Sequence, residues 1–229
     1  MSRFFVLLLL IPLLVAQTAN EVEITAEPSH HLALENEFVR VFKVEAAPHA
    51  STLMHRHRHD YVFVTLGDSD ISNEVAGKSP VELKLSDGET RFAAGNFAHV
   101  ARNLSSQPFR NITVELLQDE KMRESTGNWP ETSGEKTFTG GRTKILFVKD
   151  GVRVSETDLD PGATLPSHHH SGPHLVVAVT DLDLRSDAEG VPPAAVKISS
   201  GDIRWVAGGV THTVTNLGTR PARLVLLEF

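Results

Sequence analysis

The chain has 229 residues, enough for one large domain or two domains of about 100 residues, either of which can bury a core. Hydrophobic residues make up 40% and charged residues 22%, as is usual in soluble globular proteins. The net charge of −7 and the lack of any basic run argue against a nucleic-acid-binding surface, and the lack of cysteine excludes disulfides and thiolate ligands.

The N-terminus has the layout of a secretory signal peptide. Arg3 supplies a short basic lead, residues 4–15 are almost entirely apolar, and residues 16–19 include small side chains suited to cleavage. Because a membrane span usually needs at least about 17 apolar residues, an uncleaved anchor is the less favoured alternative. We therefore assign residues 1–19 to a signal peptide and expect a secreted or periplasmic protein with no membrane contact after cleavage.

Residues 20–118 are expected to form a first domain made of strands. Apolar residues alternate over 39–44, and residues 61–66 are rich in β-branched and aromatic side chains before a Gly-Asp turn. His30 and His31 follow Pro28 in a loop-like stretch without neighbours at ligand spacing, so we predict that both are solvated.

Residues 119–142 are polar and rich in glycine, which predicts a linker or a long surface crossing before a second domain at 143–229. The second domain repeats the first without insertion, since each matched residue lies 113 positions after its counterpart, as His168 does after His55. Such a repeat indicates duplication of one all-β unit. Glu115 and Glu228 end a strand in both copies and are predicted to be structural.

Most of the histidines lie in two pairs of segments related by this repeat. In an extended strand alternate residues share a face, so His55 and His57 point the same way, as do His168 and His170. His169 falls on the opposite face and is predicted to lie outside. Two histidines spaced two residues apart on one strand face can bind the same metal ion. The alternative is a set of hydrogen-bonded core histidines without metal.

These segments resemble the two motifs of the cupin family, and their duplication resembles a bicupin. The resemblance implies an all-β fold of two tandem cupin barrels, also called double-stranded β-helices or jelly rolls. In the second half the motif positions are occupied by Gly162, His168, His170, Gly201, Gly209, His212 and Asn216, with His174 in place of glutamate, Thr180 in place of glycine and Ala207 in place of proline. In the first half they are occupied by His55, His57, Gly67, Gly88, His99 and Asn103, with Tyr61 in place of glutamate and His49 and Asn96 in place of glycine.

Cupins hold a divalent metal with three histidines and the motif glutamate. Carried over to this chain, the resemblance implies the ligands His168, His170, His174 and His212 in the second barrel and His55, His57 and His99 in the first. Loss of the glutamate leaves only neutral imidazoles, which favours the reduced state of the ion. We expect a divalent transition metal, iron first, with zinc, nickel or copper as alternatives.

Tyr61 stands in the fourth ligand position of the first barrel. Its phenol is a candidate catalytic group, as a ligand, a proton donor or a general base, and the alternative is a packing role at the end of the barrel. His59 shares the parity of His55 and is either a substitute ligand or, as we favour, a loop residue at the barrel mouth.

The leading functional hypothesis is a metal-dependent, iron-type dioxygenase acting on a small phenolic, enol or diketone-like substrate. The alternatives are a redox-neutral lyase or isomerase and a non-catalytic protein that binds a small molecule or metal. Oxalate-type decarboxylation is disfavoured, since the family's ligand glutamate is missing from both halves. The partners expected are a small-molecule substrate and no nucleic acid, and homodimer formation is left open.

Overall fold

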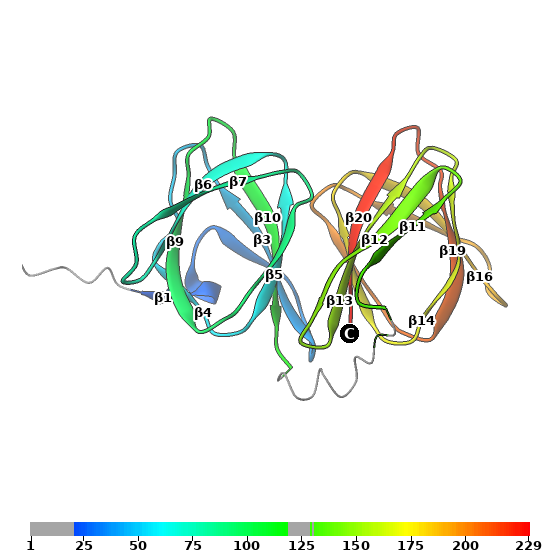
Figure 1. Ribbon diagram of the computed structural model, residues 1–229, viewed down its shortest axis with the longest axis horizontal. Coiled ribbons are helices and arrows are strands. Elements are labelled where there is room, and N and C mark those ends of the chain that lie inside the picture. Colours follow the sequence, from blue (N-terminus) through cyan, green and yellow to red (C-terminus); the bar gives the residue numbers. More distant parts are fainter. Residues whose placement is uncertain (1–20, 119–128, 130) are drawn as a thin grey trace, which may run out of the picture.

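The computed structural model describes residues 21–118, 129 and 131–229, so the predicted signal peptide lies outside the described residues. Within these ranges the chain is built of strands and one short 3₁₀ turn, η1 (Ile24–Ala26). The strands form two tandem jelly-roll barrels that lie side by side (Figure 1), which confirms the predicted all-β fold. No helix in the described ranges is long and apolar enough to cross a membrane.

The first barrel consists of two five-stranded sheets, ordered β1-β4-β9-β6-β7 and β2-β3-β10-β5-β8. β1 pairs in parallel with β4, whereas β4 and β9 pair antiparallel. Its strands are β1 (Val22–Glu23), β2 (His30–Glu35), β3 (Val39–Ala46), β4 (His55–His57), β5 (Tyr61–Leu66), β6 (Ser69–Val75), β7 (Val81–Leu85), β8 (Thr90–Ala93), β9 (Phe97–Asn103) and β10 (Phe109–Leu116).

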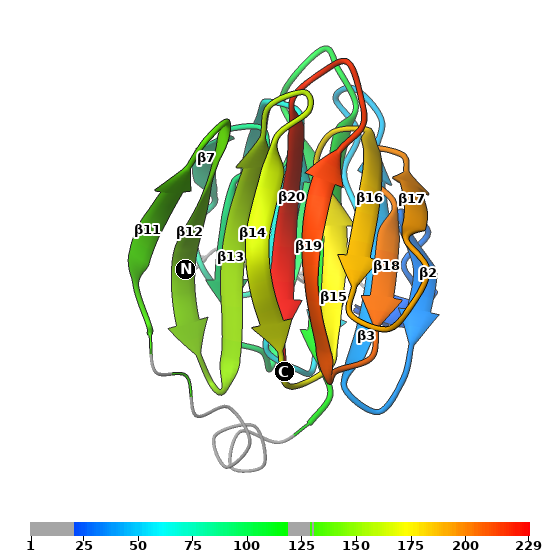
Figure 2. The same ribbon diagram turned by 90° about the vertical axis from the view of Figure 1, so that its right-hand side faces the viewer.

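The second barrel pairs a six-stranded sheet, β11-β12-β13-β20-β15-β18, with a four-stranded sheet, β14-β19-β16-β17 (Figure 2). Its strands are β11 (Gly134–Phe138), β12 (Gly141–Lys149), β13 (Val152–Leu159), β14 (Thr164–His170), β15 (His174–Ala178), β16 (Leu182–Ala188), β17 (Ala194–Ile198), β18 (Ile203–Val206), β19 (Val210–Asn216) and β20 (Ala222–Glu228). Several strands, such as β6 and β16 or β9 and β19, begin and end 113 residues apart, as the sequence repeat requires.

The predicted linker over 119–142 extends too far toward the second barrel. β11 and the start of β12 fall within it and pair antiparallel, with Gly134 opposite Ile145 and Phe138 opposite Gly141. The polar, glycine-rich composition of this stretch suits an exposed edge hairpin as well as a linker, which is why composition did not separate the two. Residues 119–128 and 130 lie outside the described residues.

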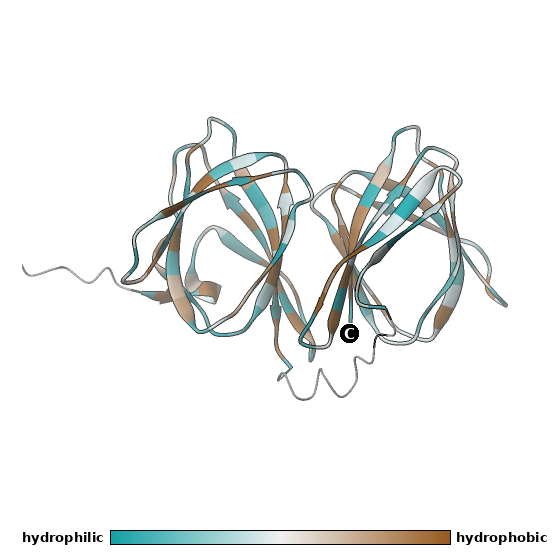
Figure 3. Cartoon of the chain, in the orientation of Figure 1, coloured by the Kyte–Doolittle hydropathy of each residue, from teal (hydrophilic) through white to brown (hydrophobic). Residues whose placement is uncertain are grey.

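The largest apolar cluster lies between the barrels, where β3, β5 and β10 of the first face β13, β15 and β20 of the second. Alternation produces this layer: Val39 and Val41 point toward the other barrel, whereas Phe42 and Val44 belong to a cluster inside the first barrel. Figure 3 shows apolar stretches on these facing strands. The buried residues of the cluster are Val39, Val41, Val62, Val64, Leu66, Ile112, Val114, Leu116, Val152, Val154, Leu175, Val177, Val179, Val225 and Leu227.

Two departures from the glycine positions of the motifs keep the backbone that glycine would give. Asn96 has a φ of 62° where its repeat counterpart Gly209 has 78°, and His49 has 60° where Gly162 has 76°. Asparagine and histidine are among the side chains that adopt this left-handed region most often. Both substitutions therefore preserve the turns that bring the histidine strands into place.

Candidate metal centres

The three predicted ligands of the first barrel come together in its interior. His55 and His57 lie on β4, and β9 places His99 directly opposite His55. The Nε2 atoms of His57 and His99 are 3.2 Å apart, and the ring centroids of His55 and His99 are 4.5 Å apart. All three side chains are buried.

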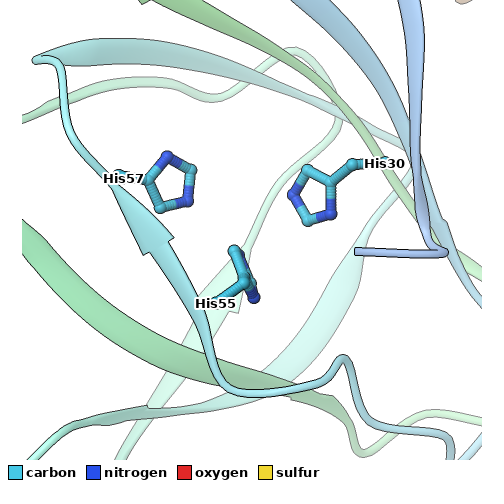
Figure 4. A group of neighbouring side chains, drawn as sticks. All are labelled: His30, His55 and His57. Atoms are coloured by element: carbon cyan, nitrogen blue, oxygen red, sulfur yellow. The ribbon is translucent and has the colours of Figure 1, made fainter. Parts of the chain in front are cut away.

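His30 joins this cluster, so the prediction that it is solvated was wrong. Its side chain is only 5% exposed, and its ring centroid lies 4.6 Å from that of His55. The strand β2 pairs with β3 so that His30 lies opposite Val44, which turns its ring inward, whereas His31 points away and is exposed as predicted. One ligand nitrogen from each of His30, His55 and His57 lies within 4.8 Å of the others (Figure 4).

The second barrel brings together His168, His170 and His212. β14 and β19 pair so that His168 lies opposite His212, and one ligand nitrogen from each of the three lies within 4.8 Å of the others. His170 is buried, whereas His168 and His212 are partly exposed. His169 lies outside, as expected, with its Nδ1 atom 2.8 Å from the hydroxyl of Thr211.

The residues in the fourth position of the motif, Tyr61 and His174, pack against a histidine ring and are not among these groups of converging nitrogens: Tyr61 is stacked and His174 is tilted. Tyr61 lies 4.2 Å from His57 at an interplanar angle of 19°, and His174 lies 4.1 Å from His170 at 30°. Both side chains are buried, and Nδ1 of His174 has no hydrogen-bond partner among the described residues. The two repeats thus use the fourth position in the same way. His59 lies in a bend after β4 and is partly exposed.

In both barrels an oxygen atom lies within hydrogen-bond distance of the Nδ1 atom of the histidines at equivalent positions. This arrangement directs Nε2 toward the centre of each barrel and fixes the ring, as is usual for histidines that bind metal. The first equivalent pair contacts a backbone carbonyl two residues earlier: His55 contacts that of Leu53 at 2.9 Å, and His168 contacts that of Pro166 at 2.8 Å. The second equivalent pair contacts a side-chain oxygen on the neighbouring strand: His99 contacts Asn73 Oδ1 at 2.5 Å, and His212 contacts Ser186 Oγ at 2.7 Å.

Glu228 and Glu115 complete this outer layer, a role beyond the purely structural one predicted from their positions at strand ends. Glu228 Oε1 lies 2.8 Å from Nδ1 of His170, and its other oxygen accepts from Arg153 at 2.7 Å. In the first barrel Glu115 Oε1 is 3.8 Å from Nδ1 of His57, too far for a hydrogen bond. Glu228 is therefore hydrogen-bonded to His170, whereas Glu115 is not hydrogen-bonded to the equivalent His57.

The charges of the two carboxyl groups also differ. Burial raises the pKa of Glu115 to about 7, although Arg40 opposes the shift. Burial acts in the same direction on Glu228, but the hydrogen bond from His170 and the charge of Arg153 outweigh it, so the pKa of Glu228 is lowered. Glu228 is accordingly the ionised partner that holds a donated Nδ1 proton.

The surroundings of five of the clustered imidazoles favour the neutral ring. Burial lowers the pKa of His55 to about 4, and burial together with neighbouring histidines lowers those of His57 to about 2 and His99 to about 3. In the second barrel burial and the neighbouring histidines lower the pKa of His174 and of His212 to about 4. Neutral rings offer lone pairs, which is the form that a metal requires.

Buried nitrogens without partners indicate that these sites fit a cation. Nε2 of His55 and Nε2 of His212 are buried and have no hydrogen-bond partner among the described residues. A buried polar atom without a partner is costly, and converging lone pairs repel one another. A divalent metal would satisfy them together, and a donor set composed of imidazoles suits iron, copper, nickel or zinc.

A cavity of about 70 Å³ adjoins the histidines of the first barrel. Its wall is mostly apolar with a few hydrogen-bonding groups, as is typical of small-molecule sites. The lining residues are His30, Val44, Thr52, His55, His57, Tyr61, Phe63, Ile71, Asn73, Leu83, His99, Ala101, Phe109, Asn111 and Thr113.

Tyr61, the predicted catalytic residue, lines this cavity. Burial, and next the charge of Glu115, raise the pKa of its phenol above the ordinary value. The hydroxyl therefore remains protonated at neutral pH. It is suited to donate a hydrogen bond or a proton and is poorly suited to act as a general base.

Comparison with known proteins yields a likeness of fold. No family model and no curated sequence matches the chain. Among solved structures it is similar to oxalate decarboxylase of Lactobacillus farciminis in a formate complex, with 11% identity, a TM-score of 0.62 and coverage of 87% of this chain and 84% of that one. Oxalate decarboxylase of Bacillus subtilis, in a study of its Mn(II) centres, gives 12% identity, a TM-score of 0.60 and coverage of 87% and 75%.

AerE from Microcystis aeruginosa is a third similar structure, with 14% identity, a TM-score of 0.57 and coverage of 88% of this chain and 97% of that one. At such identities the likeness concerns architecture and not activity. Together with the paired histidine motifs, these structures identify the architecture of the chain as the cupin fold, with two histidine clusters that could hold a divalent metal.

Proposed function

We propose that this protein is a bicupin enzyme of the dioxygenase type, which uses a divalent metal to act on a small organic molecule. The observation that carries the proposal is the set of three converging imidazoles in each barrel, without a carboxylate among the converging ligand atoms. A bound iron ion would supply Lewis acidity and electron transfer to dioxygen. The protein contributes neutral, oriented ligands and a largely apolar surrounding.

The second barrel is the better candidate for the reacting site, because His168 and His212 are partly exposed whereas the corresponding histidines of the first barrel are buried, although Nε2 of His212 itself is covered. The first-barrel cavity of about 70 Å³ is small for a ring-containing substrate, since a cavity of about 150 Å³ is the size known to admit benzene. A phenolic or diketone-like substrate therefore suits the second barrel, and Glu228 would hold His170 in place while it binds.

The test is reconstitution of the metal-free protein under anaerobic conditions with iron(II), manganese(II) or zinc(II), followed by oxygen-electrode assays with small phenols, enols and diketones. Oxygen consumption with iron alone, lost in His212→Ala, would support the proposal. If iron-loaded protein consumes no oxygen with any of these substrates, the dioxygenase proposal fails.

The two alternatives make different predictions in the same assay. A lyase or isomerase would convert substrate with zinc or nickel and without oxygen uptake, but the protonated phenol of Tyr61 weakens its case as the base. A non-catalytic binding protein would bind metal or ligand without turnover. Oxalate decarboxylation is less favoured, since Tyr61 and His174 stand where the motif carries its glutamate.

We also propose export to the periplasm or the extracellular space, on the basis of the apolar N-terminal stretch. Mass spectrometry of the protein from its native compartment would show whether the mature chain begins near residue 20. Homodimer formation is tested by light scattering coupled to size-exclusion chromatography.

A further inference from the structure

His30 differs from the other clustered histidines because it comes from β2, outside the repeat motifs. The repeat counterparts of Glu27 and His30 are Gly140 and Thr143, so the second barrel has no equivalent pair. There the hydroxyl of Thr143 contacts that of Thr157 at 2.9 Å. A histidine contributed by the strand that opens the barrel is therefore a feature of the first barrel alone among the described residues.

Glu27 holds His30 in a fixed orientation. This carboxylate is 3% exposed and lies 2.6 Å from Nδ1 of His30, and it also accepts from the backbone N–H groups of Ser29 at 2.8 Å and Leu53 at 3.1 Å. The carbonyl of the same Leu53 accepts from Nδ1 of His55. One peptide segment thus orients two rings at once.

Because Nδ1 of His30 is engaged by Glu27, Nε2 is the ring nitrogen left to face the cluster. Figure 4 shows its ring turned toward the space it shares with His55 and His57, and one nitrogen from each of the three lies within 4.8 Å of the others. A carboxylate that holds a histidine whose other nitrogen faces a ligand cluster is the arrangement typical of a metal ligand.

His99 lies beside this group as the fourth imidazole: its Nε2 atom is 3.2 Å from Nε2 of His57, and its ring centroid is 4.5 Å from that of His55. It is not among the three histidines whose nitrogens all lie within 4.8 Å of one another, so a bound ion would have to draw its ring inward. A tetrahedral ion with bonds of about 2.1 Å to nitrogen separates its ligand atoms by roughly 3.4 Å. We propose that His30, His55, His57 and His99 form a closed, tetrahedral four-imidazole site for a zinc-type ion, with Glu27 as the positioning residue for His30. A tetrahedral ion held by four protein ligands has no position left for substrate.

This inference rests on metal binding by the proposed function and divides the two barrels by role. The first site stabilises the fold and ties η1 and β2 to the barrel, whereas the second keeps an open position for chemistry. Glu27 and His30 flank the turn into β2, so the ion would fix the path of the N-terminal segment.

The experiment uses the full chain with the second site removed by His168→Ala and His212→Ala, and cobalt(II) as the probe. Tetrahedral cobalt absorbs visible light far more strongly than octahedral cobalt. The background protein should bind one cobalt with an intense spectrum. His30→Phe, which keeps a planar ring of somewhat larger size and removes the nitrogens, should weaken binding by more than about 100-fold and reduce the intensity, since loss of an outer partner alone typically costs 10–100-fold.

Glu27→Gln should weaken cobalt binding by about 10–100-fold while leaving the spectrum similar, and His31→Phe, a change in the exposed neighbour, should alter neither. Melting of the metal-free variants separates a folding defect from loss of a ligand. Unchanged affinity and spectrum in His30→Phe, or no cobalt binding by the background protein, would overturn the inference. Oxygen uptake by the iron-loaded wild type is measured separately, so failure of the dioxygenase proposal is distinguishable from failure of this one.

Discussion

Replacement of Glu228 by glutamine should weaken metal binding in the second barrel, whereas Glu115→Gln should have little effect in the first. Glu228 lies 2.8 Å from Nδ1 of His170, but the corresponding distance from Glu115 to His57 is 3.8 Å. A hydrogen bond to a charged group contributes about 1.5–3 kcal/mol, and a tenfold change in affinity corresponds to about 1.4 kcal/mol. The expected loss is thus about 10–100-fold for Glu228→Gln and less than about threefold for Glu115→Gln.

The assay is a zinc titration in competition with a chelator of known affinity. The data for the wild type and for both variants are fitted with two zinc sites per chain, one for each barrel. Glutamine keeps the size of the side chain, but it removes the ionic partner of Arg153, so melting of each metal-free variant is measured in parallel. Equal losses in the two variants, or an unchanged affinity in Glu228→Gln, would refute the argument that the outer carboxylate orients the ligand through this hydrogen bond.

The metal content after dialysis, measured by elemental analysis, should fall more in His212→Ala than in His99→Ala. After these changes the first barrel retains three clustered imidazoles, whereas the second retains two of its converging group. A larger loss from His99→Ala would show that the first barrel depends more on a single histidine than the second does. Leu227→Ala should lower the free energy of unfolding by about 2–5 kcal/mol, since Leu227 is fully buried between the barrels, whereas Leu217→Ala, at a side chain 48% exposed, should change it by less than about 0.5 kcal/mol. Denaturant unfolding compares the two variants, and similar effects would contradict the assignment of the inter-barrel core.

The fold and the clustering of three histidines in each barrel could be predicted from the sequence because they are carried by local patterns. Strand parity places His55 and His57 on one face, and the repeat shows that His168 and His170 share their setting. The structure brings both pairs to the opposing histidine of β9 or β19. Strand periodicity and sequence repeats can be read from the sequence without knowing which distant strands pair.

His30 could not be found in this way, because its place in the cluster depends on how β2 pairs with β3, a tertiary relation that spacing does not encode. Glu115 and Glu228 did carry a signal. Each is a charged residue at an inward position of an otherwise buried strand, and the arginines that contact them, Arg40 and Arg153, repeat at the same offset. Because a buried charged pair adds little net stability, a pair present in both copies could have been read as a candidate for a role beyond packing.

The apolar layer between the barrels determines the smallest unit that can be stable. Its residues occupy equivalent positions in the two repeats, as Val41 and Val154 or Val64 and Val177 do, so each barrel presents the same kind of face to the other. A single barrel released from the chain would expose this face and would associate in a concentration-dependent way. Joining the copies in one polypeptide makes the encounter intramolecular, which keeps the assembly intact at any dilution.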